Sequence, residues 1–225
     1  IIIFFKYEHM SIINSFEKKK QEIKANKSSD DPVIIAVSKT FPIEHILPLI
    51  NHGHRNFGEN KVQEAEKKWQ ELKNTTKDLK LHMIGNLQSN KAKKAVKLFD
   101  FIHSLDNEKL ANELSKRQQQ IGRNLSYFIQ INLGSEEQKG GVEIIDLKSF
   151  YEYCSKKLNL NIIGLMAIPP NDKQPEKHFQ KISELNKQYN LNQLSIGMSG
   201  DYLKAIKYGA THVRIGSAIF GIIKG

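Results

Sequence analysis

Cysteine is almost absent from this chain, since Cys154 is the only one among 225 residues. A disulfide within the chain is therefore impossible, which excludes a disulfide-stapled secreted domain and favours a reducing compartment, the cytoplasm. Cys154 falls at helical spacing with Leu147, Tyr151 and Leu158, so we expect it to be a core residue.

Long apolar runs are also absent. The apolar start of the chain, residues 1–5, is too short for a membrane span or for the hydrophobic region of a signal peptide. Met10 resembles a natural start, so we expect residues 1–9 to be a non-native or disordered extension. Residues 10–225 are then a single domain, and no membrane partner is expected.

Acidic residues are scarce relative to basic ones: 24 Asp and Glu face 34 Lys and Arg, which gives a net charge of +10. Such a balance suits nucleic acid, a membrane surface or an anionic ligand. The lysines are dispersed over the polar faces of predicted helices, without the interleaved aromatic residues of RNA-binding surfaces. We therefore expect no nucleic-acid partner. A monomer is predicted as well, because no exposed apolar stripe stands out.

The histidines do not form a metal-binding pattern. His52 and His54 flank a glycine in a predicted turn, whereas His82 and His103 lie inside predicted strands. The chain has no His-Glu-x-x-His segment and no pair of cysteines, so no metal site is expected.

Strand-like and helix-like patterns alternate along the chain. Eight short segments predict strands, and the apolar runs at 33–38 and 127–132 indicate buried ones. The eight are residues 33–38, 55–58, 81–84, 101–105, 127–132, 161–166, 194–197 and 213–215. Amphipathic segments predict helices at residues 11–27, 43–50, 59–72, 89–98, 143–158, 175–190 and 201–208, one that Asp106 or Asn107 caps, and a short one after the last strand.

This alternation predicts an α/β fold, a single (β/α)8 TIM barrel with an extra N-terminal helix. The 39% hydrophobic content is sufficient for its core. The alternative is an open doubly wound sheet, but no Gly-x-Gly-x-x-Gly segment follows the first strand. In barrels of this kind, the chemistry lies at the carboxyl ends of the strands.

Two strand ends suggest one ligand. Residues 211–221 read as a strand, a Gly216-Ser217 turn and a short apolar helix, which is how such barrels build a phosphate site. Lys39 ends the first strand, where apolar neighbours would reduce its hydration and favour the neutral amine that attacks carbonyl groups. The combination points to a phosphorylated aldehyde held as an imine. Alternatively, Lys39 is only a lysine that emerges from the rim.

Arg214 and Ser199 are further candidates. A guanidinium can donate to a pyridine nitrogen but cannot take up a proton, so a cofactor ring facing Arg214 would be a weak electron sink. Arg214 could instead pair with a carboxylate at the rim. Ser199 could donate to a phosphate or cap the helix that begins near Asp201. Residues 197–200 have the spacing Gly-x-Ser-Gly rather than Gly-x-Ser-x-Gly, so no nucleophile elbow is expected. Ile222 stands where a P-loop has its lysine, so no P-loop is expected either.

Lys139 lies in a loop that continues into Gly140 and Gly141, after the fifth predicted strand. It could reach over the ligand, or it could be a solvated loop lysine.

Six ordered segments now carry a family resemblance: AVSKT at 36–40, FGEN at 57–60, HMIGNLQSNK at 82–91, GLMAIP at 164–169, GMS at 197–199 and VRIGSAIFG at 213–221. They resemble the pyridoxal phosphate homeostasis protein family, in order, from about residue 11 to residue 221.

The resemblance implies a barrel like the N-terminal domain of alanine racemase, with pyridoxal 5′-phosphate (PLP) held as an internal aldimine on Lys39. It implies that Lys139 helps in cofactor exchange and that further residues surround the phosphate and ring, namely Asn60, Met198, Ser199, Arg214, Gly216 and Ser217. The chain departs from the family at Asn86, where proline is usual, and at Gly200, where aspartate is usual.

The expected function is that of a PLP-binding protein in vitamin B6 homeostasis, with PLP-dependent apoenzymes as possible recipients and with no catalytic residues of its own. Related two-domain racemases take a second base, a tyrosine, from an added domain that this chain is expected to lack. The alternative is a small single-domain amino-acid racemase.

Overall fold

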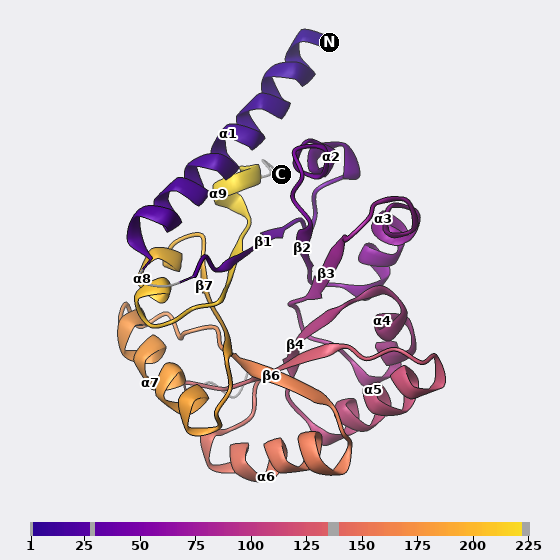
Figure 1. Ribbon diagram of the computed structural model, residues 1–225, viewed down its shortest axis with the longest axis vertical. Coiled ribbons are helices and arrows are strands. Elements are labelled where there is room, and N and C mark those ends of the chain that lie inside the picture. Colours follow the sequence, from indigo (N-terminus) through magenta and orange to yellow (C-terminus); the bar gives the residue numbers. More distant parts are fainter. Residues whose placement is uncertain (1, 28–29, 135–139, 222–225) are drawn as a thin grey trace.

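The computed structural model describes residues 2–27, 30–134 and 140–221. Its eight parallel strands pair in chain order and close into a barrel, because β8 pairs with β1 (Figure 1). The strands are β1 (Val33–Val37), β2 (Asn56–Glu59), β3 (Lys80–Met83), β4 (Phe101–Leu105), β5 (Ser126–Gln130), β6 (Asn161–Met166), β7 (Gln193–Met198) and β8 (His212–Ile215). The predicted (β/α)8 barrel is confirmed.

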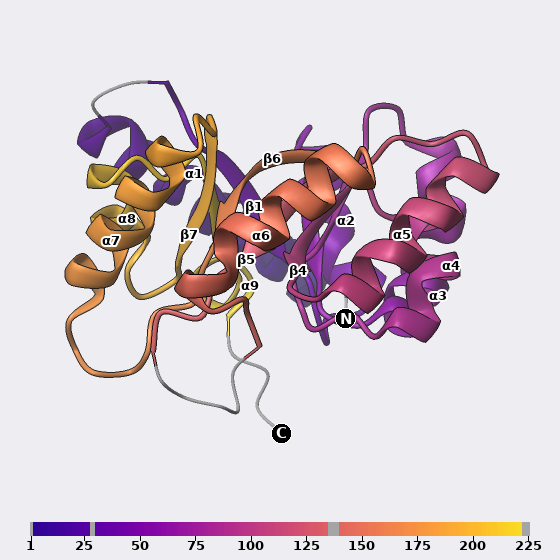
Figure 2. The ribbon, with the colours of Figure 1, turned by 90° about the horizontal axis from the view of Figure 1, so that it is seen from below.

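Helices surround the barrel on all sides, as Figures 1 and 2 show. They are α1 (Ile2–Asn26), α2 (Ile43–Asn51), α3 (Val62–Thr75), α4 (Ala92–Leu98), α5 (Glu108–Gln120), α6 (Leu147–Glu152), α7 (Pro175–Gln188), α8 (Tyr202–Lys207) and α9 (Ser217–Phe220). Short 3-10 turns η1 (Ser89–Lys91) and η2 (Ile144–Asp146) precede α4 and α6, and a π-helical turn, η3 (Tyr153–Lys157), follows α6.

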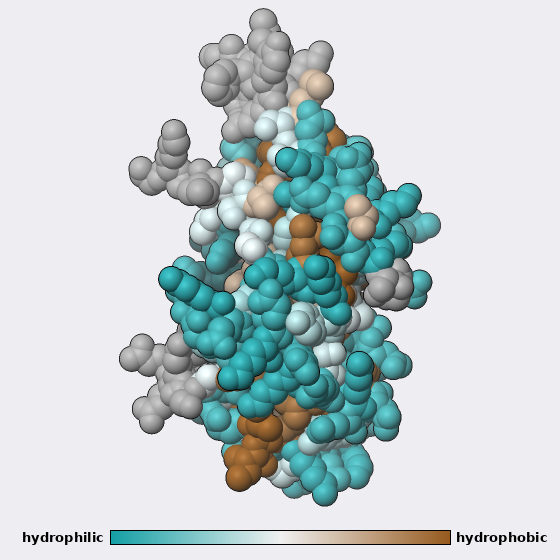
Figure 3. Space-filling view, turned by 90° about the vertical axis from the view of Figure 1, so that its left-hand side faces the viewer, coloured by the Kyte–Doolittle hydropathy of each residue, from teal (hydrophilic) through white to brown (hydrophobic). Residues whose placement is uncertain are grey.

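The extra helix α1 lies against the seam where the barrel closes. It packs on α9, α8 and α2 and buries Ile12, Phe16 and Ile23 (Figure 1). The sequence predicts a helix over residues 11–27, but the helix begins at Ile2. The face that carries α1 and α8 is dominated by hydrophilic side chains, with some apolar ones between them and a further apolar group at its lower end (Figure 3).

Other predicted boundaries also differ from those of the structure, two of them in ways that matter here. Glu59, expected to open a helix, is the fully buried last residue of β2, and α3 begins only at Val62. Periodicity missed this because a buried carboxylate has the same letter as an exposed one. The helix expected over 143–158 divides into η2, α6 and η3. Cys154 is fully buried as expected, and burial raises the pKa of its thiol to about 12.

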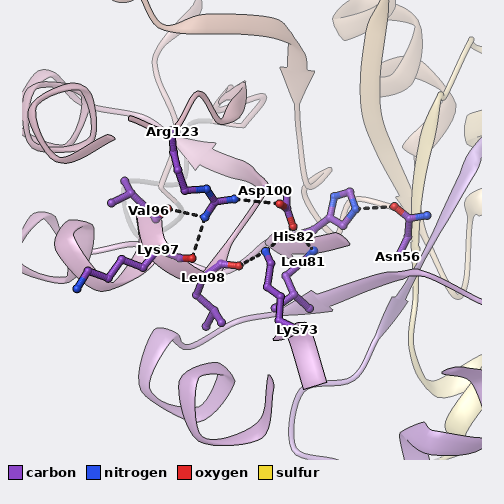
Figure 4. Close-up of polar contacts among 9 residues, drawn as sticks. All are labelled: Asn56, Lys73, Leu81, His82, Val96, Lys97, Leu98, Asp100 and Arg123. Atoms are coloured by element: carbon purple, nitrogen blue, oxygen red, sulfur yellow. Dashed lines mark hydrogen bonds and ion pairs between the residues drawn. The ribbon is translucent and has the colours of Figure 1, made fainter. Parts of the chain in front are cut away.

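The strands begin at an end of the barrel that we call the N-terminal rim, where Asp100 holds three elements together (Figure 4). Its Oδ2 accepts from Lys73 Nζ at 2.7 Å and from the backbone N–H of Leu81 at 2.9 Å. Its Oδ1 accepts from Arg123 at 3.0 Å, and Arg123 also donates to two carbonyl groups at the end of α4. Every oxygen of this carboxylate is therefore paired, which is typical of a structural site.

Candidate functional site

The opposite end of the barrel, the C-terminal rim, gathers most of the predicted site residues on four consecutive strands. Closure places β7, β8, β1 and β2 side by side, so segments from the two ends of the chain meet. Met198 pairs with Arg214, and Ile215 pairs with Ala36. A side-chain carbon on Gly216 would lie 3.2 Å from Val37 Cβ, so the turn after β8 touches the strand that leads to Lys39.

Lys39 lies two residues beyond the end of β1 and is exposed. The expectation that apolar strand residues remove it from water is therefore wrong: the strand ends before the side chain is covered. Its neighbour Thr40 has φ +67°, an unfavourable conformation for a β-branched residue, so the chain turns sharply here. Thr40 N–H donates to Glu64 at 2.9 Å, which fixes that turn from α3.

The strand end that carries Lys39 is also held from within the protein. Ser38 Oγ donates to Glu59 Oε1 at 2.7 Å, and the carbonyl of Ser38 accepts from Lys68 Nζ at 2.8 Å. Lys68 and Trp69 both donate to the same Glu59 oxygen at 2.9 Å. The exposed lysine thus starts from a buried, rigid anchor.

Arg214 lies inside the barrel, only 4% exposed, rather than at the rim. Its Nη1 donates to the Ser195 carbonyl at 2.9 Å and to Ser195 Oγ at 2.6 Å, and its Nη2 donates to the Ala167 carbonyl at 2.9 Å. Burial lowers the pKa of Arg214 to about 10, which leaves it charged at neutral pH. The expected alternative, a rim carboxylate, is not among its described hydrogen-bond partners.

Ser199 and the turn after β8 form a ready anion site. Ser199 Oγ accepts from the backbone N–H groups of Gly216 at 3.1 Å and Ala218 at 3.5 Å. These N–H groups sit at the start of α9, where a phosphate would take the place of the serine hydroxyl as their acceptor. Ser217, the first residue of α9, is exposed. The predicted strand, Gly-Ser turn and short helix are confirmed.

Met198 and Asn60 complete the described part of the rim. Met198 is 37% exposed, and its N–H donates to Asp201 at 2.6 Å. Asn60, half-buried, lines a cavity of about 300 Å3 outside β2 and β3 together with Lys61 and Lys91. Lys139 lies outside the described residues.

The sequence analysis missed three residues that support the site. Glu59 and Lys68 form a buried ion pair behind Lys39, and Ser195 holds Arg214. The only available signal was Glu59 beside Asn60 in the FGEN segment. Ser195 gave none, because a hydroxyl inside a strand pattern does not reveal which side chain it will meet across a barrel.

Other sites have weaker support. A larger cavity, about 580 Å3, lies between α1 and the first strands, lined by Phe16, Ile34 and Asn56 among others, and contains none of the predicted site residues. Within residues 2–27, 30–134 and 140–221, no group of three or more His, Cys, Asp or Glu residues could hold a metal ion. The helices in those same ranges include none with the length and apolarity that a membrane span needs.

The barrel is similar to known proteins. The family model "Alanine racemase, N-terminal domain" matches residues 14–224 of this chain. Among curated relatives, the pyridoxal phosphate homeostasis protein of Aquifex aeolicus is 42% identical over 207 residues, covering 88% of this chain and 90% of that protein. Its counterpart in Schizosaccharomyces pombe is 37% identical, covering 94% and 93%. The chain therefore belongs to the pyridoxal phosphate homeostasis protein family.

Solved structures agree. PipY of Synechococcus elongatus, with PLP bound, is 34% identical and superposes with a TM-score of 0.82, covering 93% of this chain and 100% of that one. Alanine racemase from Corynebacterium glutamicum gives a TM-score of 0.69 at 15% identity, and the match spans 95% of this chain but 61% of the racemase. The second likeness concerns the fold alone.

Proposed function

We propose that this chain binds PLP covalently through Lys39 and acts in PLP homeostasis, without robust catalysis of its own. The single observation that carries this proposal is Arg214, a buried cation whose described hydrogen bonds all go to neutral groups. A buried charge of this kind calls for an electron-rich ligand. The family relationship and the PLP-bound relative support the same ligand.

The residues present fit this cofactor. Gly216 and Ala218 offer backbone N–H groups to a phosphate, with Ser199 beside them. Arg214 would donate to the ring nitrogen and, as a pure donor, would leave that nitrogen without a proton. Lys39 stands exposed on the neighbouring strand with an amine that can capture an aldehyde reversibly. Met198 and Asn60 would line the ring, and Lys139 would assist exchange.

A carrier fits better than an enzyme. Racemisation needs proton transfer on both faces of the substrate, and Lys39 supplies one amine only. Tyr202, just beyond Ser199, donates its hydroxyl to Glu22 on α1, and Tyr127 donates to Gln118. These two tyrosines are thus engaged elsewhere, and a ring nitrogen without a proton is a weak electron sink.

The likeness to alanine racemase keeps one alternative open, a small amino-acid racemase. Incubation of the PLP-loaded protein with L-alanine in heavy water separates the two. A carrier leaves the α-proton in place, whereas a racemase exchanges it for deuterium and produces D-alanine.

The first test of PLP binding is the visible absorption spectrum of the purified protein with added PLP, before and after borohydride. We expect a yellow band that borohydride bleaches, and a mass increase that peptide mapping places on Lys39. A protein that stays colourless and gains no mass would overturn the proposal.

The proposal also covers the domain bounds, the recipients of PLP, the cellular compartment and the oligomeric state. We infer that residues 10–225 are one PLP-binding domain, which the family match over residues 14–224 supports. Residues 2–9, expected to be a non-native or disordered extension, are helical and continue α1 beyond this domain. PLP-dependent apoenzymes would be the recipients, in the cytoplasm, with the protein as a monomer that binds neither nucleic acid nor membrane.

A further inference from the structure

Three buried polar side chains connect Arg214 to the far side of the barrel. Ser195 Oγ, which accepts from Arg214, lies 2.8 Å from His103 Nδ1. His103 Nε2 lies 3.0 Å from His82 Nδ1, and His82 Nε2 lies 3.0 Å from Asn56 Oδ1. The last of these contacts is drawn in Figure 4. The result is one unbroken chain of hydrogen bonds from β8 through β7, β4 and β3 to β2.

The two histidines in this chain are neutral. Both are fully buried, and burial holds the pKa of His82 and of His103 well below the usual value. Their surroundings are aromatic: His103 stacks on Phe128 with ring centroids 4.3 Å apart, and His82 stacks on Phe101 at 4.4 Å. Neither ring has a carboxylate among the hydrogen bonds described for it.

The groups at the two ends of this series of hydrogen bonds, Asn56 and Arg214, determine the position of every proton between them. Asn56 Oδ1 can only accept, so His82 carries its proton on Nε2 and leaves Nδ1 bare. His82 Nδ1 therefore accepts from His103 Nε2–H, which leaves His103 Nδ1 bare as well. That nitrogen accepts from the Ser195 hydroxyl, whose oxygen accepts from Arg214, a group that can only donate. All four hydrogen bonds point the same way, away from the guanidinium.

We propose that Ser195, His103 and His82 are positioning residues that hold the Arg214 guanidinium through one directed chain of hydrogen bonds ending on Asn56. Each member presents a lone pair toward Arg214 and a proton away from it, so the negative ends of their dipoles all face the cation. This series of hydrogen bonds stabilises the guanidinium as a carboxylate would, but it carries no negative charge. Arg214 keeps its full positive charge for the ligand, in a fixed orientation.

The effect on PLP rests on the proposed function, but the chain itself can be tested without any ligand. In ligand-free protein labelled with 15N, we expect His82 and His103 to be Nε2–H tautomers. The guanidinium of Arg214 should give separate Nη signals, because its rotation is blocked. In Ser195→Ala the carbonyl groups of Ser195 and Ala167 still accept from the guanidinium, so the Nη signals should exchange faster rather than merge. A proton on Nδ1 of either histidine, or an Nη exchange rate that Ser195→Ala leaves unchanged, would overturn the proposal whether or not PLP binds.

Variants at His103 add a functional readout. His103→Leu removes both contacts, whereas His103→Asn keeps an acceptor near the Nδ1 position. Phe128→Leu is the matched control, because it disturbs the packing of His103 and leaves the hydrogen bonds alone. We expect PLP affinity to fall about tenfold in His103→Leu and to recover most of that loss in His103→Asn. Equal losses in His103→Leu and Phe128→Leu would show a merely structural role and sink the proposal. A wild-type protein that binds no PLP would instead count against the proposed function.

Discussion

The two rims of this barrel contain the same kinds of side chain but differ in whether the polar groups of those side chains are paired. At the N-terminal rim, Asp100 has both oxygens paired, and its partners Lys73 and Arg123 also donate to backbone carbonyls. At the C-terminal rim, Lys39 is exposed, and the donors around Gly216 are paired only with a serine hydroxyl. The polar groups at the first rim have partners within the protein, whereas those at the second rim are available to a ligand.

This difference shows where the barrel places stability and where it places function. Residues at the strand starts join helices and strands that are distant in the chain, so replacing them should loosen the fold. Exposed residues just beyond the strand ends, such as Lys39, make few contacts that the fold needs, so replacing them should affect the ligand more than the fold. Each of the following experiments separates these two effects.

Lys39→Ala should have the largest effect on the ligand and almost none on the fold. All PLP that borohydride can fix should be lost, because the amine that captures the aldehyde is gone. The free energy of unfolding should change by less than about 0.5 kcal/mol, since the side chain is exposed. Absorption spectra, mass measurement and urea unfolding check both parts.

Lys61→Ala is the matched control, because Lys61 is also an exposed lysine at the C-terminal rim. It should retain the yellow band. Fixation of PLP on another lysine in Lys39→Ala would contradict the assignment of Lys39.

Asp100→Ala should give the reverse result. It leaves Lys73, Arg123 and the N–H of Leu81 without their acceptor, which should lower the free energy of unfolding by about 2–3 kcal/mol. The folded fraction should still bind PLP normally. Asp172→Ala, which breaks a more exposed pair with His178, should cost less than about 0.5 kcal/mol. Equal losses in the two variants would erase the contrast between the rims.

Acid should weaken the barrel interior rather than the C-terminal rim. Burial lowers the pKa of His212 to about 4, below the value near 6.5 of an unfolded chain. Between these values the unfolded state binds more protons, so the stability that neutral His212 contributes is present above pH 6.5 and is lost as the pH falls toward 4. From pH 7.5 to pH 5 this histidine should account for at most about 2 kcal/mol.

Urea unfolding of the wild type and of His212→Asn at pH 7.5 and pH 5 measures this contribution. The loss on acidification should be smaller in the variant, because one titrating group has been removed. An identical loss in both proteins would show that His212 does not take part.

Ser199→Ala should have the smallest effect. It removes a hydroxyl next to the Gly216 and Ala218 N–H groups that would donate to the phosphate, and PLP affinity should fall about fivefold, which corresponds to about 1 kcal/mol. Ser149→Ala, which removes an exposed hydroxyl on α6, should leave affinity unchanged. An unaltered affinity in Ser199→Ala would leave the backbone as the whole anion site.

Most of the fold could be predicted from the sequence, because most strands contain a short apolar run and alternate with amphipathic segments. Phe101–Leu105 and Asn161–Met166 have the predicted boundaries, and Asn107 caps α5 by accepting from Leu110 N–H at 2.9 Å. The candidate residues on β7, β8, β1 and β2 also meet at one rim as barrel closure requires.

The buried polar contacts could not be predicted. Arg214 was placed at the rim, because a sequence gives no sign that a charge is covered from the opposite wall of a barrel. His82 and His103 were placed correctly inside strands, but 21 residues separate them, and their contact depends on how far the barrel twists. Glu59 was read as helical for the same reason: its partners Ser38 and Trp69 are neighbours only in three dimensions.

Ser199 also affects how readily a ligand binds and is released. The N–H groups at the start of α9 are already bonded to its hydroxyl before any phosphate arrives. Binding is thus a swap of one acceptor for another, and departure lets the hydroxyl return to its place. Such an exchange of acceptors reduces the difference in free energy between the ligand-free and the ligand-bound protein. For the proposed PLP carrier, ready release of the cofactor would matter more than tight binding.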